Sequence, residues 1–281
     1  MVNKIFLSIL LFSAFLSSKG ATVDTVTVKS GRMAKGFKCV VIKPASYKNT
    51  KKTFPVVYLL HGFSGSYNNW IKYVPGLTSY ADQYQLMIVC PDGGYAGWYF
   101  DSPIDLHSQY ETYIGTEVPH YIDSAYRTIR NAGQRAITGL SMGGHGAIFI
   151  AWRHPHQFGA AGSMSGVVDL KESAHKYAIE KVIGDTTNNL LAWKQYSVLY
   201  MVEHKDHILP AMIFDCGIND GFIGVNRRLH LKMMTLNIPH DYIERPGVHG
   251  WEYWKNAVSY QLLYFHKYFM AHQVNSRSVL P

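Results

Sequence analysis

The stretch Gly139–Gly144 constrains the fold most, because it carries a glycine-x-serine-x-glycine pattern between two different kinds of element. Arg135–Thr138 before it is short and strand-like, and Gly146–Ala151 after it is apolar and helical. A serine on such a sharp strand-to-helix turn adopts a strained backbone conformation, and the flanking glycines prevent clashes with neighbouring chain. The turn raises the serine Oγ above the carboxyl edge of a sheet, at the positive end of the following helix. We therefore interpret Ser141 as a nucleophile, with a plain glycine-rich turn as the alternative.

Short apolar runs alternate with helical stretches along most of the chain. The predicted strands are 56–60, 86–90, 136–138, 160–164, 211–214 and 241–244. The predicted helices are 76–83, 106–126, the stretch after Ser141, 224–237 and 251–271. This alternation predicts an α/β fold with a mostly parallel sheet covered by helices on both faces.

Two further segments complete the predicted organisation. Thr22–Val28 alternates threonine and valine, and Phe37–Ile42 is expected to pair with it as an N-terminal antiparallel hairpin. Val167–Pro210 is helical and polar, and is expected to cross the active-site edge. The 281 residues, 47% of them hydrophobic, suffice for one large core, so residues 21–281 are expected to form one domain.

The first twenty residues have the composition of a signal peptide. Lys4 supplies a positive start, Ile5–Leu16 is apolar, and Ser18 and Gly20 are small residues suited to a cleavage site. The apolar run is too short to span a bilayer comfortably. We predict cleavage after Gly20, no stable membrane insertion, and a secreted or periplasmic protein, with an N-terminal membrane anchor as the alternative.

The cysteines do not suggest a disulfide framework or a metal site. Cys39, Cys90 and Cys216 are an odd number, far apart in sequence and each within an apolar run, so buried and inert thiols are expected. The pair His154 and His156 lacks a zinc-binding spacing, and no cofactor is expected.

The chain is basic, with a formal net charge of +8 that would fall by two on loss of Lys4 and Lys19. This charge favours acidic surroundings such as an anionic envelope or polysaccharide. Lys48, Lys51 and Lys52 are its one local cluster, in a predicted loop, and nucleic-acid binding is not expected.

A nucleophilic serine needs a base, and the base needs a third group to orient it. Among the fourteen histidines, His249 is the best candidate, because it follows a predicted strand and precedes a helix within Arg245–Gly250. That location is the carboxyl edge where Ser141 should emerge; a structural histidine at a helix start is the alternative.

The acid is expected between serine and histidine in chain order. Asp220 lies in the loop Gly217–Gly221, directly after a predicted strand, and is preferred. Asp215, inside the apolar run 213–216, is an alternative candidate for the acid. Asp185 and Asp206, in the polar segment Val167–Pro210, are further candidates.

Acyl transfer also requires amide donors for the negative charge that develops on the carbonyl oxygen. We expect the backbone N–H groups of Met142, which follows the nucleophile, and of Phe63, in the turn after the 56–60 strand. His61 in that turn is expected to be structural, and His145 to pack against the sheet.

Four motifs, in order along nearly all of residues 21–281, resemble those of the esterase D-type family. They are Leu59–Gly62, Gly139–Gly144, Cys216–Asp220 and Pro246–Trp251, and the run Asn226–His230 also fits. The family includes feruloyl and acetyl-xylan esterases, S-formylglutathione hydrolases and mycolyltransferases of the antigen 85 kind.

The resemblance implies an α/β-hydrolase fold, a triad of Ser141, Asp220 and His249, and amide donors at Phe63 and Met142. The chain departs from the family at Gly250, where relatives often have an acidic residue.

The resemblance further implies that the substrate is an acyl ester, either a small molecule or linked to a plant polysaccharide, with acetyl or feruloyl as the acyl group. The aromatic residues expected to line the acyl or sugar pocket are Tyr95, Trp98, Tyr99 and Phe100, whereas Trp251 and Trp254 are expected in the core. An acyltransferase, a serine peptidase and a non-catalytic carbohydrate-binding protein are the alternatives, and the sequence does not indicate an oligomeric state.

Overall fold

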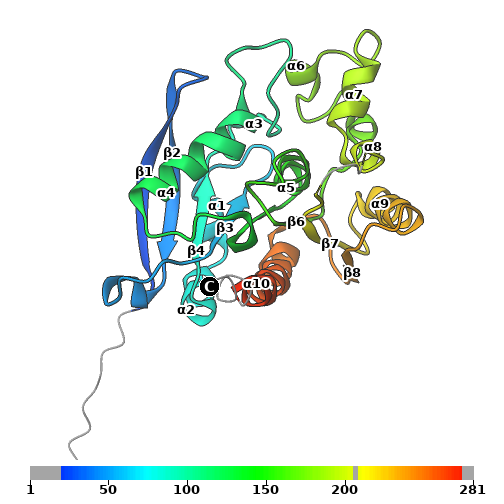
Figure 1. Cartoon of the computed structure of the whole chain (residues 1–281). Helices are drawn as coiled ribbons and strands as arrows, with labels where there is room; N and C mark the ends of the chain where they lie inside the picture. The colour runs from blue at the N-terminus through cyan, green and yellow to red at the C-terminus, as the bar shows by residue number, and fades with distance from the viewer. Residues whose placement is uncertain (1–19, 205–207, 274–281) are drawn as a thin grey trace, which may run out of the picture.

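The structure is a computed structural model that describes residues 20–204 and 208–273. Its centre is an eight-stranded sheet in the order β1-β2-β4-β3-β5-β6-β7-β8 (Figure 1). The strands are β1 Thr22–Ser30, β2 Lys35–Lys43, β3 Val56–Leu60, β4 Met87–Pro91, β5 Arg135–Gly139, β6 Ala160–Met164, β7 Ala211–Gly217 and β8 Asp241–Arg245. From β4 to β8 all neighbours are parallel, whereas β1 and β2 form an antiparallel hairpin whose second strand pairs antiparallel with β4. The predicted sheet and hairpin are confirmed.

Helices cover both faces of this sheet (Figure 1). They are α1 Asn69–Tyr73, α2 Leu77–Tyr84, α3 Tyr110–Thr112, α4 Val118–Ala125, α5 Met142–Arg153, α6 Glu180–Ile183, α7 Leu190–Tyr196, α8 Val198–Met201, α9 Ile223–Thr235 and α10 Trp251–Gln273, with 3₁₀ turns η1 Ala45–Lys48, η3 Ala132–Gln134 and η4 Leu170–Ser173.

The central strands contribute to two separate cores, because successive side chains of a strand point to opposite faces of the sheet. Along β3, Val56, Tyr58 and Leu60 join the core beneath α4, α5 and α9. Val57 and Leu59 join the core beneath α1, α2 and α10. The continuous apolar runs read from the sequence are thus strands buried on both sides.

The predicted helix over 106–126 begins later than expected, at Tyr110, and contains a π-helical turn, η2 Tyr113–Glu117. The loop before it is organised by polar side chains: the Ser102 hydroxyl accepts the N–H of Asp105, and an Asp101 carboxylate oxygen accepts the N–H of Thr112. These local bonds compete with helix formation.

The segment after β6 forms η4 and α6–α8, as predicted, and lies at the upper right of Figure 1. All three cysteines are buried free thiols. Within residues 20–204 and 208–273, none of the helices combines the length and apolar character needed to cross a bilayer. The predicted signal peptide falls in residues 1–20, nearly all of it outside the described part of the chain.

Candidate active site

Ser141 lies on the turn between β5 and α5, at the carboxyl edge of the sheet. Its backbone has φ 53° and ψ −117°, a left-handed conformation that is strained for a residue with a side chain. Its N–H donates to the Met164 carbonyl at 2.9 Å, and its own carbonyl accepts the His145 N–H at 3.0 Å. The strained conformation is thus held by bonds to β6 and to the first turn of α5.

The glycines beside this serine are required by close backbone approach. A Cβ on Gly143 would lie 2.5 Å from the His61 carbonyl oxygen, and one on Gly139 would lie 2.7 Å from the Leu60 oxygen. Both contacts are with backbone atoms, which cannot move aside. The turn therefore packs directly against the end of β3, as the glycine spacing predicted.

A hydrogen-bonded chain of three side chains joins three separate strand ends. His249 Nε2 lies 3.0 Å from Ser141 Oγ, and His249 Nδ1 lies 2.9 Å from Asp220 Oδ2. Asp220 follows β7 and His249 follows β8, so parallel strands bring both to the edge that carries Ser141. With Nδ1–H donating to the carboxylate, the Nε2 lone pair faces the serine hydroxyl.

Asp220 is arranged to remain ionised. Burial by itself would raise its pKa, but hydrogen bonds and the charge of His249, with the Phe222 N–H and the Ser165 hydroxyl, shift the pKa of Asp220 below its ordinary value. The Phe222 N–H donates to Asp220 Oδ1 at 2.8 Å. The carboxylate therefore has one oxygen for the loop backbone and one for the imidazole.

The turn after β3 lies against the serine side chain, where the sequence places amide donors. A Cβ on Gly62 would be 3.4 Å from Ser141 Cβ, so the Gly62 backbone, directly before Phe63, lies against the serine side chain. Within the described residues, neither the Phe63 N–H nor the Met142 N–H has a hydrogen-bond acceptor. The N–H groups of the residue after Ser141 and of the residue after Gly62 are thus free to donate.

Two other histidines near the turn have structural partners. His61 Nδ1 donates to the Gly62 carbonyl and its Nε2 accepts the Gly93 N–H, both at 2.8 Å, and burial lowers its pKa. His145 is buried and donates to the Tyr196 carbonyl at 2.8 Å, and burial lowers its pKa to about 4. His145 contacts the rings of Trp98 and Phe100. His145 therefore packs against the 93–102 loop and α7, and not against the sheet as predicted.

The prediction that Trp98, Tyr99 and Phe100 line a pocket is wrong. All three are fully buried, and the Tyr99 hydroxyl donates to the His61 carbonyl at 2.9 Å. These three rings belong to the hydrophobic core that packs beneath the site. Tyr95, the fourth predicted residue, is 66% exposed and does lie at the surface.

The aromatic residues at the rim come from four different segments. Tyr95 and Tyr177 each contact the Phe63 ring edge-on, with ring centroids 5.1 and 5.4 Å apart. The Phe222 ring lies 5.1 Å from the His249 ring and 6.5 Å from that of Tyr177. We call these four residues, Phe63, Tyr95, Tyr177 and Phe222, the aromatic rim.

Sequence reasoning missed Tyr177 and Phe222. The sequence did contain a signal for Phe222, because this aromatic residue lies two positions after Asp220, the preferred acid of the triad. The sequence contained no such signal for Tyr177, because its position depends on a distant loop. The indole Nε1 of Trp98, in that loop, donates to the Tyr177 carbonyl at 2.9 Å. Trp254 is in the core, as predicted, and its ring also contacts His249 edge-on at 5.0 Å.

The competing residues lie elsewhere. Asp215 is fully buried below the sheet edge, where Gln261 and Tyr253 donate to it. Asp185 accepts the N–H groups of Thr187 and Asn188 in its own loop, and Asp206 is outside the described residues. His154 lies 3.0 Å from Glu111. Across residues 20–204 and 208–273, no group of three or more His, Cys, Asp or Glu is placed to hold a metal ion.

Comparison with known proteins identifies relatives over most of the chain. The Esterase family model matches residues 30–265. Esterase Rv1288 of Mycobacterium tuberculosis is 27% identical over 235 residues, covering 74% of this chain and 51% of that protein. The diacylglycerol acyltransferase/mycolyltransferase Ag85B of Mycobacterium leprae is 32% identical over 182 residues, covering 62% of this chain and 53% of that protein.

Among solved structures, a ferulic acid esterase superposes with a TM-score of 0.76 at 29% identity, covering 89% of this chain and 99% of that one. The chain spans about half the length of the curated relatives that it matches.

Proposed function

Because the chain belongs to the Esterase family and has the α/β-hydrolase fold, we propose that it hydrolyses carboxylic esters through Ser141, His249 and Asp220. The observation that carries the proposal is the continuous hydrogen-bonded chain from Asp220 through His249 to the strained Ser141. Ser141 is the nucleophile, His249 the general base and Asp220 the group that orients the imidazole.

The geometry supports an acyl-enzyme mechanism. His249 Nε2 takes the proton of Ser141 as Oγ attacks the ester carbonyl, and the tetrahedral oxyanion accepts the N–H groups of Phe63 and Met142. His249 returns the proton to the leaving alcohol as the acyl-enzyme forms. Water then attacks the acyl group with His249 again as base, which releases the acid and restores the serine.

We propose an aromatic acyl group, such as a feruloyl ester on a plant polysaccharide, in preference to acetyl. The aromatic rim borders the catalytic histidine and the free amides with rings from four segments, more apolar surface than an acetyl group would fill. Aromatic rings that meet edge-on gain about 0.5–1.5 kcal/mol beyond the area they bury. The match to a ferulic acid esterase agrees with this choice.

An acyltransferase is the second candidate, favoured by the similarity to a mycobacterial mycolyltransferase. The same acyl-enzyme would then be attacked by a sugar hydroxyl in place of water. The His249 side chain is 31% exposed, so water reaches the base, which favours hydrolysis. We also propose export through residues 1–20, by the signal-peptide pattern alone.

The test compares wild type with Ser141→Ala on p-nitrophenyl acetate, methyl ferulate and a feruloylated xylo-oligosaccharide. We expect kcat to fall at least about 10⁴-fold in the variant, with unchanged folding by circular dichroism and no fluorophosphonate labelling. Full turnover by the variant would refute the nucleophile. Adding trehalose or an oligosaccharide and measuring transesterified product separates the acyltransferase.

The acyl preference is tested at the aromatic rim with Tyr177→Ala. We expect kcat/KM for methyl ferulate to fall about tenfold and that for p-nitrophenyl acetate to change less than about twofold, since only the larger acyl group contacts the rim. Tyr80→Ala, a change remote from the sheet's carboxyl edge on α2, is the matched control. Equal losses on both esters would rule out a role in acyl selection.

A further inference from the structure

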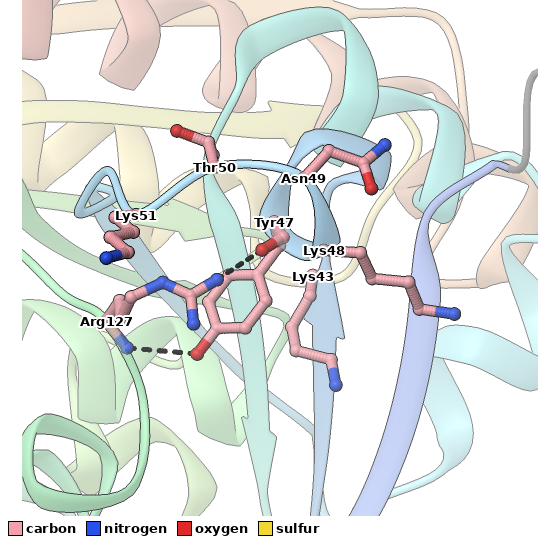
Figure 2. A pocket seen from close by; sticks show the side chains of 7 residues that line it. All are labelled: Lys43, Tyr47, Lys48, Asn49, Thr50, Lys51 and Arg127. Carbon is pink, nitrogen blue, oxygen red and sulfur yellow. Dashed lines mark hydrogen bonds between the residues drawn. The ribbon is translucent and has the colours of Figure 1, made fainter.

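One hollow on the surface lies far from Ser141, at the opposite edge of the sheet. It has a volume of about 560 Å³ and is lined at the end of β2, along η1 and after α4 by Lys43, Tyr47, Lys48, Asn49, Thr50, Lys51 and Arg127 (Figure 2). Because β2 runs antiparallel to β4, its last residue lies at the amino ends of the parallel strands. A five-residue strand spans roughly 17 Å, so the hollow and the catalytic edge are separate surfaces.

A second hollow of about 520 Å³ shares Tyr47 and Arg127 with the first and adds Arg130 and Thr53. We call the two together the basic groove. Its first half contains no aliphatic side chain: its lining is cationic, amide, hydroxyl or aromatic. Figure 2 shows the lysine side chains arranged around the Tyr47 ring, with Arg127 beside it.

The positive charge of the basic groove is largely unneutralised. Lys43 pairs with Asp24 at 2.7 Å, whereas Lys48 and Lys51 have no ion-pair partner among the described residues and are exposed. The neighbouring acids are engaged elsewhere. Asp82 accepts the N–H groups of Ala21 and Ala45, and Asp123 pairs with Arg135 at 2.7 Å. The groove therefore has an excess of cations that no side chain of the described chain balances.

Tyr47 and Arg127 form a fixed floor between the two hollows. The guanidinium carbon of Arg127 lies 3.7 Å from the Tyr47 ring centroid, and its Nη2 donates to the Tyr47 carbonyl. The Tyr47 hydroxyl accepts the backbone N–H of Arg127 at 3.1 Å. Arg127 Nε is buried and has no partner within the described residues. The Arg127 guanidinium is thus held in place by Tyr47, while its Nε–H has no acceptor within the described residues.

We propose that the basic groove binds an acidic oligosaccharide, with Lys48, Lys51 and Arg127 facing the carboxylates of its uronic-acid residues. Two adjoining hollows suit consecutive sugar units of one chain, and the amide and hydroxyl side chains of Asn49, Thr50 and Thr53 suit sugar hydroxyls. A lipid surface would require apolar side chains around the cations, which the first hollow lacks.

This site does no chemistry: it would hold a polysaccharide at one edge of the sheet while the opposite edge acts on an ester. The choice of a sugar polymer, rather than another polyanion, rests on the proposed action on polysaccharide esters. The charge cluster at Lys48, Lys51 and Lys52 noted in the sequence is part of the groove or adjoins it.

The test measures binding of oligogalacturonate to the wild-type chain by calorimetry. This ligand carries no acyl ester, so no turnover interferes, and p-nitrophenyl acetate hydrolysis is measured separately. We expect binding at low salt that weakens as salt rises, and at least tenfold weaker binding by the double variant Lys48→Glu/Lys51→Glu. Hydrolysis by this variant should match wild type.

The matched control is Lys194→Glu/Lys267→Glu, which makes the same charge change at two exposed lysines outside the groove. We expect this control to bind within about twofold of wild type. The proposal is overturned if the control weakens binding as much as the groove variant, or if neutral xylo-oligosaccharides bind as well. It is equally overturned if oligogalacturonate does not bind at low salt, or if only anionic lipid vesicles bind. Failure of the esterase proposal would instead appear in the hydrolysis assay.

Discussion

Asp215 and Asp220 lie at the same end of β7, yet the protein gives their carboxyl groups opposite environments. Asp220 is also buried, but it lies at the edge that carries Ser141, bonded to His249 and the Phe222 N–H, and its pKa is lowered despite burial. Asp215 is fully buried, and that burial raises its pKa to about 6, although Arg245, Gln261 and Tyr253 all favour the charged form. Which carboxylate contacts the imidazole is thus decided by the loop after β7, which places Asp220 against His249.

The buried carboxylate connects β7 to both ends of the loop that carries His249. Arg245, which begins that loop, has its Nη2 3.2 Å from Asp215 Oδ1, close enough to pair but not aligned for a hydrogen bond. Tyr253, just beyond the loop, donates to Asp215 Oδ1 at 2.8 Å. Asp215 therefore connects three elements of the fold, whereas Asp220 is the residue proposed to orient the catalytic histidine. Four predictions test this division.

The largest expected effect is on catalysis at Asp220. Asp220→Asn keeps the shape but removes the charge that fixes the histidine tautomer, so kcat on p-nitrophenyl acetate should fall about 10⁴-fold. The free energy of unfolding in urea should fall by only about 1 kcal/mol, because the amide oxygen still accepts the Phe222 N–H. A variant that keeps its rate would mean that another group orients His249.

Asp215→Ala should show the reverse pattern. It leaves the Arg245 guanidinium, whose side chain is only 14% exposed, without its partner. Breaking a buried pair from one side costs about 3–5 kcal/mol, so unfolding in urea should show a loss of about 4 kcal/mol. We expect kcat/KM within about tenfold of wild type at a temperature where the variant is folded. A rate loss as large as that of Asp220→Asn, with stability unchanged, would erase the distinction between the two aspartates.

The two carboxyl groups should also give opposite dependences of stability on pH. An unfolded aspartate titrates near pH 3.9, and folded Asp215 near pH 6. Between these values the folded chain holds a proton that the unfolded chain has released, so stability from this group falls as pH rises, by about 3 kcal/mol in all. Asp220 acts in the other direction: its contribution is present above its unfolded pKa and is lost as pH falls through its lowered folded pKa.

The measurement for this prediction is urea unfolding of wild type and Asp215→Asn at several pH values between 4 and 7. The asparagine cannot ionise, so we expect the variant to gain stability relative to wild type as pH rises. A difference between the two chains that is constant across this range would contradict a raised pKa at Asp215.

The fold and the meeting of Ser141, Asp220 and His249 could be predicted because both depend on local pattern. The strands predicted at Val56–Leu60 and Ala160–Met164 have those bounds in the structure, since each is a short apolar run with turn residues at its ends. Parallel strands end at one edge, so residues that follow successive strands must converge there. The choice of Asp220 over Asp215 followed from the same rule.

Features that depend on distant segments could not be predicted. Trp98 and Tyr99 adopt positive φ angles of 51° and 63° in a loop predicted to line a pocket, and the Tyr99 ring fills space left by glycines. A Cβ on Gly146 of α5 would lie 2.4 Å from the Tyr99 ring, so this burial requires a glycine far along the sequence. Only part of the basic groove could be predicted from the sequence, because folding brings Lys43 and Arg127 next to Lys48 and Lys51.

The smallest expected effect comes from Tyr253→Phe, which removes a single hydrogen bond from Asp215 and keeps the ring. A hydrogen bond to a charged group contributes about 1.5–3 kcal/mol, so we expect a loss near 1.5 kcal/mol in urea unfolding at pH 7. Because the lost bond favours the carboxylate, the pKa of Asp215 should rise further, and the decline in stability should extend to higher pH. Tyr260→Phe is the matched control: that ring lies 4.3 Å from the Arg245 guanidinium carbon, and the change keeps the ring. We expect it to alter stability by less than about 0.5 kcal/mol. A tenfold loss of kcat in Tyr253→Phe without a change in stability would instead place the buried aspartate in the catalytic machinery.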